Sequence, residues 1–585
     1  MSITPAARSP FGHPWAVAAG VATVALAASI GVVLGSFLIN GKAGAEIGAA
    51  AGYVPATAVT YVEARLDLPD GQRAALQELL GRFNGIDLDD VMGPALADRL
   101  DELFAASGTG HSYSEDIAPW FDGRVAFALL DADYISLEAA MSPIGGIGPG
   151  SLDGIPNMLV MVGTTDPAAT GTFLDEVRGE AEAKGATATS ETYGGTTIWS
   201  ITGVADELEQ MGTSVPSGGA YAVAGDQLLL GAGAEAIRTA LDVHAGTADS
   251  FAARDDVAAA VADLPAQRVA TFVSDSAPVV AAMREALTSF MPELDRIADV
   301  YASGLSMLQV GSLHFEGDRV VADGVGTMPS RGMANSDRSL AEAIPADALF
   351  YLDGTDIGSY LADIIGAAKE AAAAAGQEAA VAQVEGILGA DIESFFAWID
   401  DAAVAGGWDG TAPWGGLVIT PTSIEEAELR LGQLRALAGL AGMAGGDVPL
   451  MVSEEEIDGV TVTRFAVSGM GADVALEYAV TDDRVLLGLG DGFIARALGT
   501  DAGASLAASA RFGAALAEVG GASGTSVVWA DLAALRDAIA EGLPAEEQGT
   551  YDEKVAPWLE PLDTLVGVMR VEGERIISQG ALIAK

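Results

Sequence analysis

Short apolar runs separated by two or three polar residues recur along the chain and predict β-hairpins. The clearest examples are YAVAGDQLLL at 221–230, LHFEGDRVV at 313–321, EYAVTDDRVLLG at 477–488 and MRVEGERII at 569–577. A short polar turn between two apolar runs is typical of a hairpin, and hairpins pair their strands antiparallel. The pattern therefore predicts antiparallel sheets, with helices packed on one side.

Other segments add single strands and helices to this picture. The runs AVTYVEARLDL at 58–68, RVAFALLD at 124–131 and NMLVMVG at 157–163 are bounded by turn residues and predict strands. Apolar residues recur at helical spacing in QRAALQELLGRF at 72–83, which predicts an amphipathic helix. The alanine-rich segment 363–388 predicts one long surface helix.

The same phrases occur twice in the same order, which predicts an internal duplication. VPATAVTYVE at 54–63 matches IPADALFYLDG at 344–354, so that Tyr61 and Glu63 correspond to Tyr351 and Asp353. Further matches follow between 116–121 and 391–396, 157–163 and 415–421, 192–201 and 456–465, 227–241 and 484–498, and 314–324 and 570–580. Six collinear matches predict two copies of one α+β unit.

The duplication, together with the apolar, polar and Gly/Pro-rich segments of the chain, sets the predicted domain boundaries. We expect a leader at 1–13, a transmembrane helix at 14–39, a linker at 40–52, a first α+β repeat at 53–329, a linker at 330–341 and a second α+β repeat at 342–585. The Gly/Pro loop at 144–157 is longer than its counterpart at 406–414, so the first copy carries an insertion there.

The segment 14–39, PWAVAAGVATVALAASIGVVLGSFLI, has no charge and is long enough to span a bilayer, which takes about 20 apolar residues. It predicts a single-pass plasma-membrane protein, and the short leader places the N-terminus in the cytoplasm and the acidic body outside. The triplet Ala43-Gly44-Ala45 leaves a cleaved signal peptide as the alternative. Gly31 and Gly35 have the small-xxx-small spacing that would allow a homodimer through two such helices.

Charge and composition exclude several classes of partner. The 585 residues include 82 Asp and Glu against 29 Lys and Arg, a formal net charge of -53, which argues against nucleic-acid binding. This excess of carboxylates indicates either a soluble, non-sticky surface or adaptation to salt. Because cysteine is absent, there is no disulfide, no catalytic thiol and no thiolate metal site.

Residues that could carry chemistry do not form a convincing constellation. The pairs Gly231/Gly233 and Gly488/Gly490 follow apolar strands, but the strands belong to hairpins and Phe493 occupies the third small position, so we expect tight turns and no dinucleotide site. The four histidines are too scattered for a metal or catalytic set: His13, His111, His244 and His314. We expect no catalytic, cofactor or metal residue.

The remaining candidates have structural interpretations. Asp275 and Asp531, and likewise Asp116 and Asp391, are predicted helix caps. Four aromatic residues of the matched motif are predicted to be core and not a sugar platform: Trp120, Phe121, Phe395 and Phe396. A hydrolase with paired carboxylates stays open, but 82 acids give no way to choose a pair.

Two stretches are similar to a known family. YVPATAVTYVEARLDLPDGQRAALQELLGRFNGIDLDD at 53–90 and YSEDIAPWFDGRVAFAL at 113–129, following the apolar segment, resemble bacterial single-pass membrane proteins grouped as domain-of-unknown-function family 3352. The resemblance implies an envelope location and supplies no activity and no site residues.

These observations predict a membrane-anchored, non-enzymatic envelope protein whose duplicated acidic ectodomain contacts another envelope protein or a polymer. The alternative is a binding or carrier module for an apolar, lipid-like ligand, held in a cleft between sheet and helices.

Overall fold

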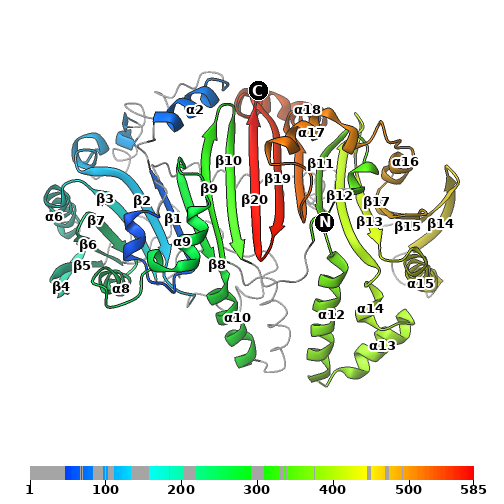
Figure 1. The fold of residues 1–585 in the computed structure, drawn as a ribbon, viewed down its shortest axis with the longest axis horizontal. Coiled ribbons are helices and arrows are strands. Elements are labelled where there is room, and N and C mark those ends of the chain that lie inside the picture. The colour runs from blue at the N-terminus through cyan, green and yellow to red at the C-terminus, as the bar shows by residue number, and fades with distance from the viewer. Residues whose placement is uncertain are drawn as a thin grey trace, which may run out of the picture. The chain divides into compact units, whose positions relative to one another are not determined.

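The fold is described from a computed structural model of the chain (Figure 1). The structure describes residues 47–65, 68, 70–83, 97–98, 100–102, 111–132, 157–183, 185–202, 218–290, 308–327, 334–336, 339–374, 376–443, 450–467, 474–490 and 492–585. The chain divides into two compact units. The first comprises Gly35–Pro329 with Glu574–Ile577, and the second comprises Met1–Leu34, Ser330–Gly573 and Ser578–Lys585.

Strands of the first unit pair antiparallel in the order β4-β5-β6-β7-β3-β2-β1-β8-β9-β10 (Figure 1). Their bounds are β1 Thr60–Arg65, β2 Phe121–Leu129, β3 Met158–Thr164, β4 Thr187–Tyr193, β5 Thr196–Thr202, β6 Gly218–Ala224, β7 Gln227–Gly231, β8 Ala270–Asp275, β9 Leu308–Glu316 and β10 Arg319–Thr327. The helical elements are η1 Ala49–Tyr53, α2 Asp70–Leu80, η2 Tyr113–Ile117, α6 Pro167–Ala183, α8 Ala234–His244, η5 Phe251–Ala253, α9 Asp255–Ala262 and α10 Ser276–Phe290.

The second unit repeats this order strand for strand, as β14-β15-β16-β17-β13-β12-β11-β18-β19-β20. Its strands are β11 Ala348–Gly354, β12 Ile399–Trp408, β13 Pro413–Pro421, β14 Leu450–Ile457, β15 Val460–Val467, β16 Val474–Val480, β17 Val485–Leu489, β18 Ser526–Asp531, β19 Leu562–Glu572 and β20 Arg575–Ala584. Its helical elements are η7 Ser339–Glu342, α12 Ile357–Ala374, α13 Glu378–Leu388, α14 Ile392–Phe395, α15 Ile424–Met443, α16 Phe493–Leu498, η8 Leu506–Ala508, α17 Ala510–Glu518, α18 Leu532–Gly542, α19 Ala545–Lys554 and α20 Ala556–Leu559.

Local sequence explains several of these elements. The four predicted hairpins form as β6–β7, β9–β10, β16–β17 and β19–β20. The segments matched in the sequence occupy equivalent strands or the helical turns beside them. The predicted helix at 72–83 forms as α2, with Leu76 and Leu79 buried. The long helix predicted at 363–388 is wrong, because α12 ends at Ala374 and Gly376, with φ 72°, separates it from α13.

The predicted packing of helices on one side of each sheet is also wrong. In the first unit α8 and α9 pack on the face that carries Tyr61, while Leu174 of α6 packs on the opposite face with Leu228. In the second unit Phe493 and Phe512 lie on the face of Tyr351, while Ala427 and Leu431 of α15 lie on the other. Strands such as β17, VLLGL, are apolar on both faces, so packing helices on either face of the sheet buries apolar side chains.

The predicted transmembrane helix at 14–39, with Gly31 and Gly35, lies outside the described residues. Within the part of the chain that the structure does describe, none of the helices combines the length and the apolar character needed to cross a membrane. The longest one, α15, carries Glu425, Glu426 and Arg430 among its charges. The predicted fold class with an N-terminal spanning helix, and the plasma-membrane localisation that depended on it, are therefore not supported. The described residues form antiparallel sheets with helices, without a spanning helix among them.

Candidate functional site

The glycine pairs mark turns between strands and helices. Gly231 ends β7 and Gly233 caps α8, while Gly488 lies within β17 and Gly490, with φ 77°, follows it. Because β7 and β17 pair antiparallel with both of their neighbours, the parallel βαβ setting of a dinucleotide site does not form at either pair.

Three histidines lie within the described residues, and each has its own local partners. The His244 ring stacks on Tyr53 with centroids 4.2 Å apart. Burial, followed by the charge of Asp226, raises the pKa of Tyr53 to about 12. His111 lies between Asp116, at 3.5 Å, and Glu180, at 3.4 Å. His314 lies 3.1 Å from Glu316 and 3.4 Å from Asp323. No set of His, Asp and Glu side chains among the described residues could hold a metal ion.

The aspartates predicted as caps hold backbone N–H groups. Asp531 accepts from Ala534 at the start of α18, and Asp391 accepts from the N–H groups of residues 393 and 394 at the start of α14. Asp275 likewise accepts from Ala277 N–H at 3.0 Å. Asp116 differs: it accepts from Ser112 N–H at 2.7 Å, and Ser112 is the cap of that turn.

The aromatic residues of the matched motif belong mainly to the interior. Trp120 is 3% and Phe395 1% exposed, whereas Phe121 and Phe396 are partly buried. The Trp120 indole N–H donates to the Asp116 carbonyl oxygen at 2.6 Å, and its ring packs against Phe173. The burial of Trp120 and Phe395 leaves little of either ring to stack on a ligand.

Among the described residues, each unit contains a buried tyrosine–carboxylate pair within one strand. The Tyr61 hydroxyl donates to Glu63 at 3.0 Å, and the Tyr351 hydroxyl donates to Asp353 at 2.7 Å. Burial raises the pKa of Glu63, although the hydrogen bonds from Tyr61 and Gly48 oppose this shift. Each carboxylate also accepts a backbone N–H within the fold, because Glu63 binds Gly48 N–H at 2.8 Å and Asp353 binds Val527 N–H at 2.6 Å. The pairs join β1 to η1 and β11 to β18.

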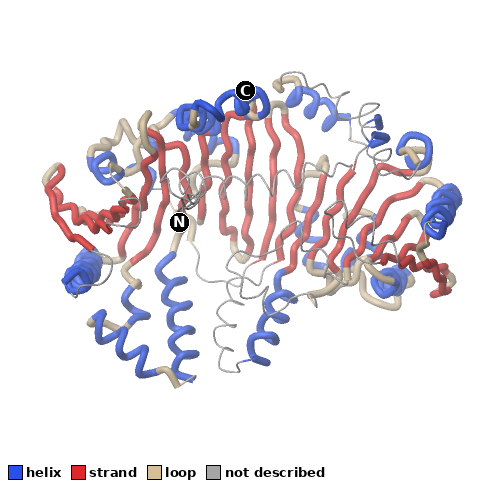
Figure 2. Tube along the Cα trace, turned by 180° about the vertical axis from the view of Figure 1, so that it is seen from behind, coloured by secondary structure: helices blue, strands red, loops and turns tan. Residues whose placement is uncertain are grey.

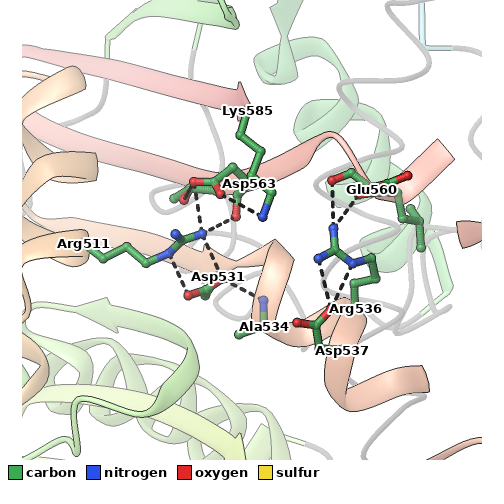
Figure 3. Close-up of polar contacts among 10 residues, drawn as sticks. Arg511, Asp531, Ala534, Arg536, Asp537, Glu560, Asp563 and Lys585 are labelled. Carbon is green, nitrogen blue, oxygen red and sulfur yellow. Dashed lines mark hydrogen bonds and ion pairs between the residues drawn. The ribbon is translucent and has the colours of Figure 1, made fainter. Parts of the chain in front are cut away.

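An arginine anchors the aspartate at the junction of strand and helix in both units, but from different positions. Figure 3 shows Arg511 between Asp531, at 2.7 Å, and Asp563, at 3.1 Å, with the neighbouring Arg536 on the Glu560 carbonyl oxygen at 2.8 Å. In the first unit Arg254 binds Asp275 at 2.7 Å. Alignment of η5 with η8 pairs Arg254 with Ser509, so the arginine has moved by two residues while its contact is retained. The cluster ties elements together and has a structural explanation.

A set of exposed aliphatic side chains on the second unit has no structural explanation in the contacts of the described residues. We call it the apolar row: Leu352, Val404, Leu417, Leu476 and Leu489, which are 46%, 37%, 37%, 45% and 61% exposed.

Strand register brings these five side chains together on one face of five neighbouring strands. Leu352 lies opposite Val404, which lies opposite Leu417, and Leu489 lies opposite Leu476. At about 4.8 Å between strands, β11 to β16 spans roughly 19 Å. Helix α15 covers only part of this face, and α12 and α13 extend from one end of the strands without crossing them (Figure 2).

The equivalent face of the first unit differs at defined positions. Val62, Phe127 and Val160 replace the first three residues of the row and are partly buried. Gly219 and Ala232 stand where the second unit has Leu476 and Leu489. The row was not predicted from the sequence, although the match of QLLLGAGAEAIRTAL with RVLLGLGDGFIARAL already aligns Leu489 with Ala232.

Comparison with known proteins identifies a family and no activity. The family described as "Protein of unknown function (DUF3352)" matches residues 17–566. No curated protein and no solved structure matches the chain.

Proposed function

Since the chain belongs to the family of proteins of unknown function DUF3352, we propose its role from its own surface: it is a non-enzymatic binding protein whose second unit contacts a partner protein through the apolar row. The exposure of the row carries this proposal. Transferring apolar side chains out of water is favourable by roughly 25 cal/mol per Å², so five aligned and exposed aliphatic groups favour association.

The type of surface favours a protein partner over a small apolar ligand. Small ligands bind in concave sites that bury about 70 to 90% of the ligand surface. Side chains that are 37 to 61% exposed and spread over five strands resemble instead the apolar centre of a protein interface, which is surrounded by a polar rim.

Acidic residues lie beside the row and determine which charge a partner needs around its own apolar patch. Asp356, Asp400 and Asp401 lie where β11 ends and β12 begins, and Asp356 N–H donates to Asp401 at 3.2 Å. Burial, then the charges of Asp401 and Asp356, raises the pKa of Asp400, so this local charge is not fully compensated. A partner with Lys or Arg beside its apolar patch would be electrostatically complementary.

The absence of cysteine allows a site-specific test. Leu417→Cys would carry a benzophenone label at the row, and Thr550→Cys would carry the same label on exposed α19 as the control. We expect irradiation of cells that naturally express the chain to give a discrete protein adduct from position 417 and none of that mass from position 550.

A second substitution links the adduct to the row. Adding Leu489→Asp should reduce the position-417 adduct at least about tenfold, since a carboxylate at the centre of an apolar contact costs more than about 1.4 kcal/mol. Identical adducts from positions 417 and 550, or a lipid adduct alone, would rule out the proposed protein partner.

A further inference from the structure

The outer strand of the first unit, β4, has a regular backbone and an edge that no described strand covers. Among the described residues β4 pairs only with β5, through seven consecutive positions from Thr187↔Thr202 to Tyr193↔Thr196 without a register shift. It contains no proline and no glycine. Proteins usually protect such an edge with charges, proline or a bulge, because unpaired N–H and C=O groups recruit another strand.

The turn between β4 and β5 determines which backbone groups face outward. Gly194 and Gly195, with φ 54° and 86°, form a two-residue hairpin turn, so Tyr193 and Thr196 are a hydrogen-bonded pair. Hydrogen-bonded and non-hydrogen-bonded pairs alternate along an antiparallel ladder. The N–H and C=O groups of Ala188, Ser190 and Thr192 therefore point away from β5.

The corresponding strand of the second unit, β14, is protected by charge. Its turn, Asp458 and Gly459, has φ 51° and 81°, and the same alternation directs the backbone groups of Val452, Glu454 and Glu456 outward. Two glutamates therefore occupy the positions that Ser190 and Thr192 occupy in β4. Glu454 forms an ion pair with Arg435 of α15, but Glu455 and Glu456 follow it directly, so β14 carries three carboxylates where β4 carries one. This excess of negative charge disfavours pairing of β14 with a copy of itself.

The single charge of β4 is engaged within its own unit. Glu191 binds Arg238 of α8, with Arg238 Nε donating at 2.9 Å. The Tyr193 hydroxyl donates to the Asp242 carboxylate of the same helix at 2.8 Å. Because the chain has a net charge of -53, copies repel each other over most of their surface, and β4 is an edge where two copies can approach without opposing free carboxylates.

We propose that β4 pairs antiparallel with β4 of a second copy of this chain, with Ser190 opposite Ser190 of that copy. A two-fold interface is self-complementary, and this register also places Ala188 opposite Thr192. All three outward-facing residues then lie in hydrogen-bonded pairs, which joins the two hairpins into one four-stranded sheet. This interface uses other residues than the apolar row and is independent of it.

Disulfide trapping tests both the interface and its register in the full chain. In the proposed register the Cα atoms of residue 190 in two copies lie about 5.5 Å apart, within disulfide range. Under mild oxidation at about 10 µM protein, Ser190→Cys should form a cross-linked dimer at least about ten times faster than Thr550→Cys, a control at an exposed position of α19. Equal rates for the two variants, or no cross-link from either, would overturn the proposal.

Two further variants separate loss of the interface from loss of the fold. Ser190→Pro removes one outward N–H without removing a β4–β5 hydrogen bond, and Ser190→Glu with Thr192→Glu gives β4 the charges of β14. With circular dichroism unchanged, each should raise the dimer dissociation constant at least about tenfold in sedimentation equilibrium, whereas Glu454→Pro should leave it unchanged. If either β4 variant dimerises as the wild type does, pairing through β4 is wrong.

Discussion

The Gln72 side chain and the Phe315 backbone exchange two hydrogen bonds. Phe315 N–H donates to Gln72 Oε1 at 2.6 Å, and Gln72 Nε2 donates to the Phe315 carbonyl oxygen at 3.2 Å. The pairing of β8 with β9 ends at Leu313, so Phe315 lies beyond the end of β8. The Gln72 side chain of α2 makes the hydrogen bonds with Phe315 that a longer β8 would make. Both residues are buried, which makes the exchange costly to remove.

Replacing Gln72 with leucine should therefore destabilise the first unit. Gln72→Leu leaves two buried backbone groups of Phe315 without a partner, and we expect the free energy of unfolding to fall by about 2 kcal/mol. Gln77→Leu, at an exposed position of α2, is the matched control and should change it by less than about 0.5 kcal/mol. Equal effects of the two substitutions in urea unfolding would contradict this account.

The buried carboxylate of Glu63 predicts a pH dependence of stability. Its pKa in the folded state is raised by burial above the ordinary value of 4.5, so the folded state holds the proton more tightly than the unfolded state. The stabilising contribution is fully present below pH 4.5 and is lost as the pH rises through the folded-state pKa. The side chain introduced by Glu63→Gln cannot titrate, so this variant does not lose stability in the same way. Its stability relative to the wild type should therefore increase as the pH rises.

Urea unfolding at pH 5 and pH 8 measures this difference. The glutamine introduced by Glu63→Gln keeps an acceptor for Gly48 N–H, so the comparison reports mainly on charge. Glu456→Gln, on an exposed side chain, should show no such trend. A Glu63→Gln variant that loses stability relative to the wild type as the pH rises would reverse the predicted sign.

Gly416 should tolerate no side chain. A Cβ added there would lie 2.3 Å from the Leu487 carbonyl oxygen and 2.2 Å from the Phe493 ring, and the backbone atom cannot rotate away. We expect Gly416→Ala to lower the free energy of unfolding by about 3 kcal/mol. Gly432→Ala, in α15 with open space around it, should raise it by about 0.5 to 1 kcal/mol. Calorimetric melting temperatures that move in the same direction would contradict the steric argument.

Because the arginine stands at different positions in the two units, we expect Ser509→Arg to restore part of the stability lost in Arg511→Ser. Arg511→Ser removes the cation from Asp531 and Asp563, and because Arg511 is 37% exposed we expect a loss of only about 1 to 2 kcal/mol after solvent screening. Adding Ser509→Arg places the arginine where Arg254 stands in the first unit and should recover part of that loss. The recovery is incomplete because Ser509 also caps α17. A double variant no more stable than Arg511→Ser would show that position 509 cannot reach Asp531.

Local pattern predicted the elements better than their packing. The hairpins at 221–230 and 477–488 form because a polar turn between apolar runs suffices to pair adjacent segments. The helix expected over 363–388 is broken because Gly376 adopts a left-handed conformation that periodicity does not reveal. The expectation of a non-enzymatic role stays a prediction.

The duplicated succession of strands could be predicted from the residues alone, because Tyr61 and Tyr351 recur with the same neighbours and local propensity acts within a few residues. Which apolar positions are covered became clear only from the packing of the folded chain. Leu487 and Leu489 stand two residues apart on one face of β17, yet Leu487 packs beside the α15 cluster while Leu489 is 61% exposed. Burial on this face depends on helices that are distant in the chain. No local sequence pattern shows which strand residues such a helix packs against and which it leaves exposed.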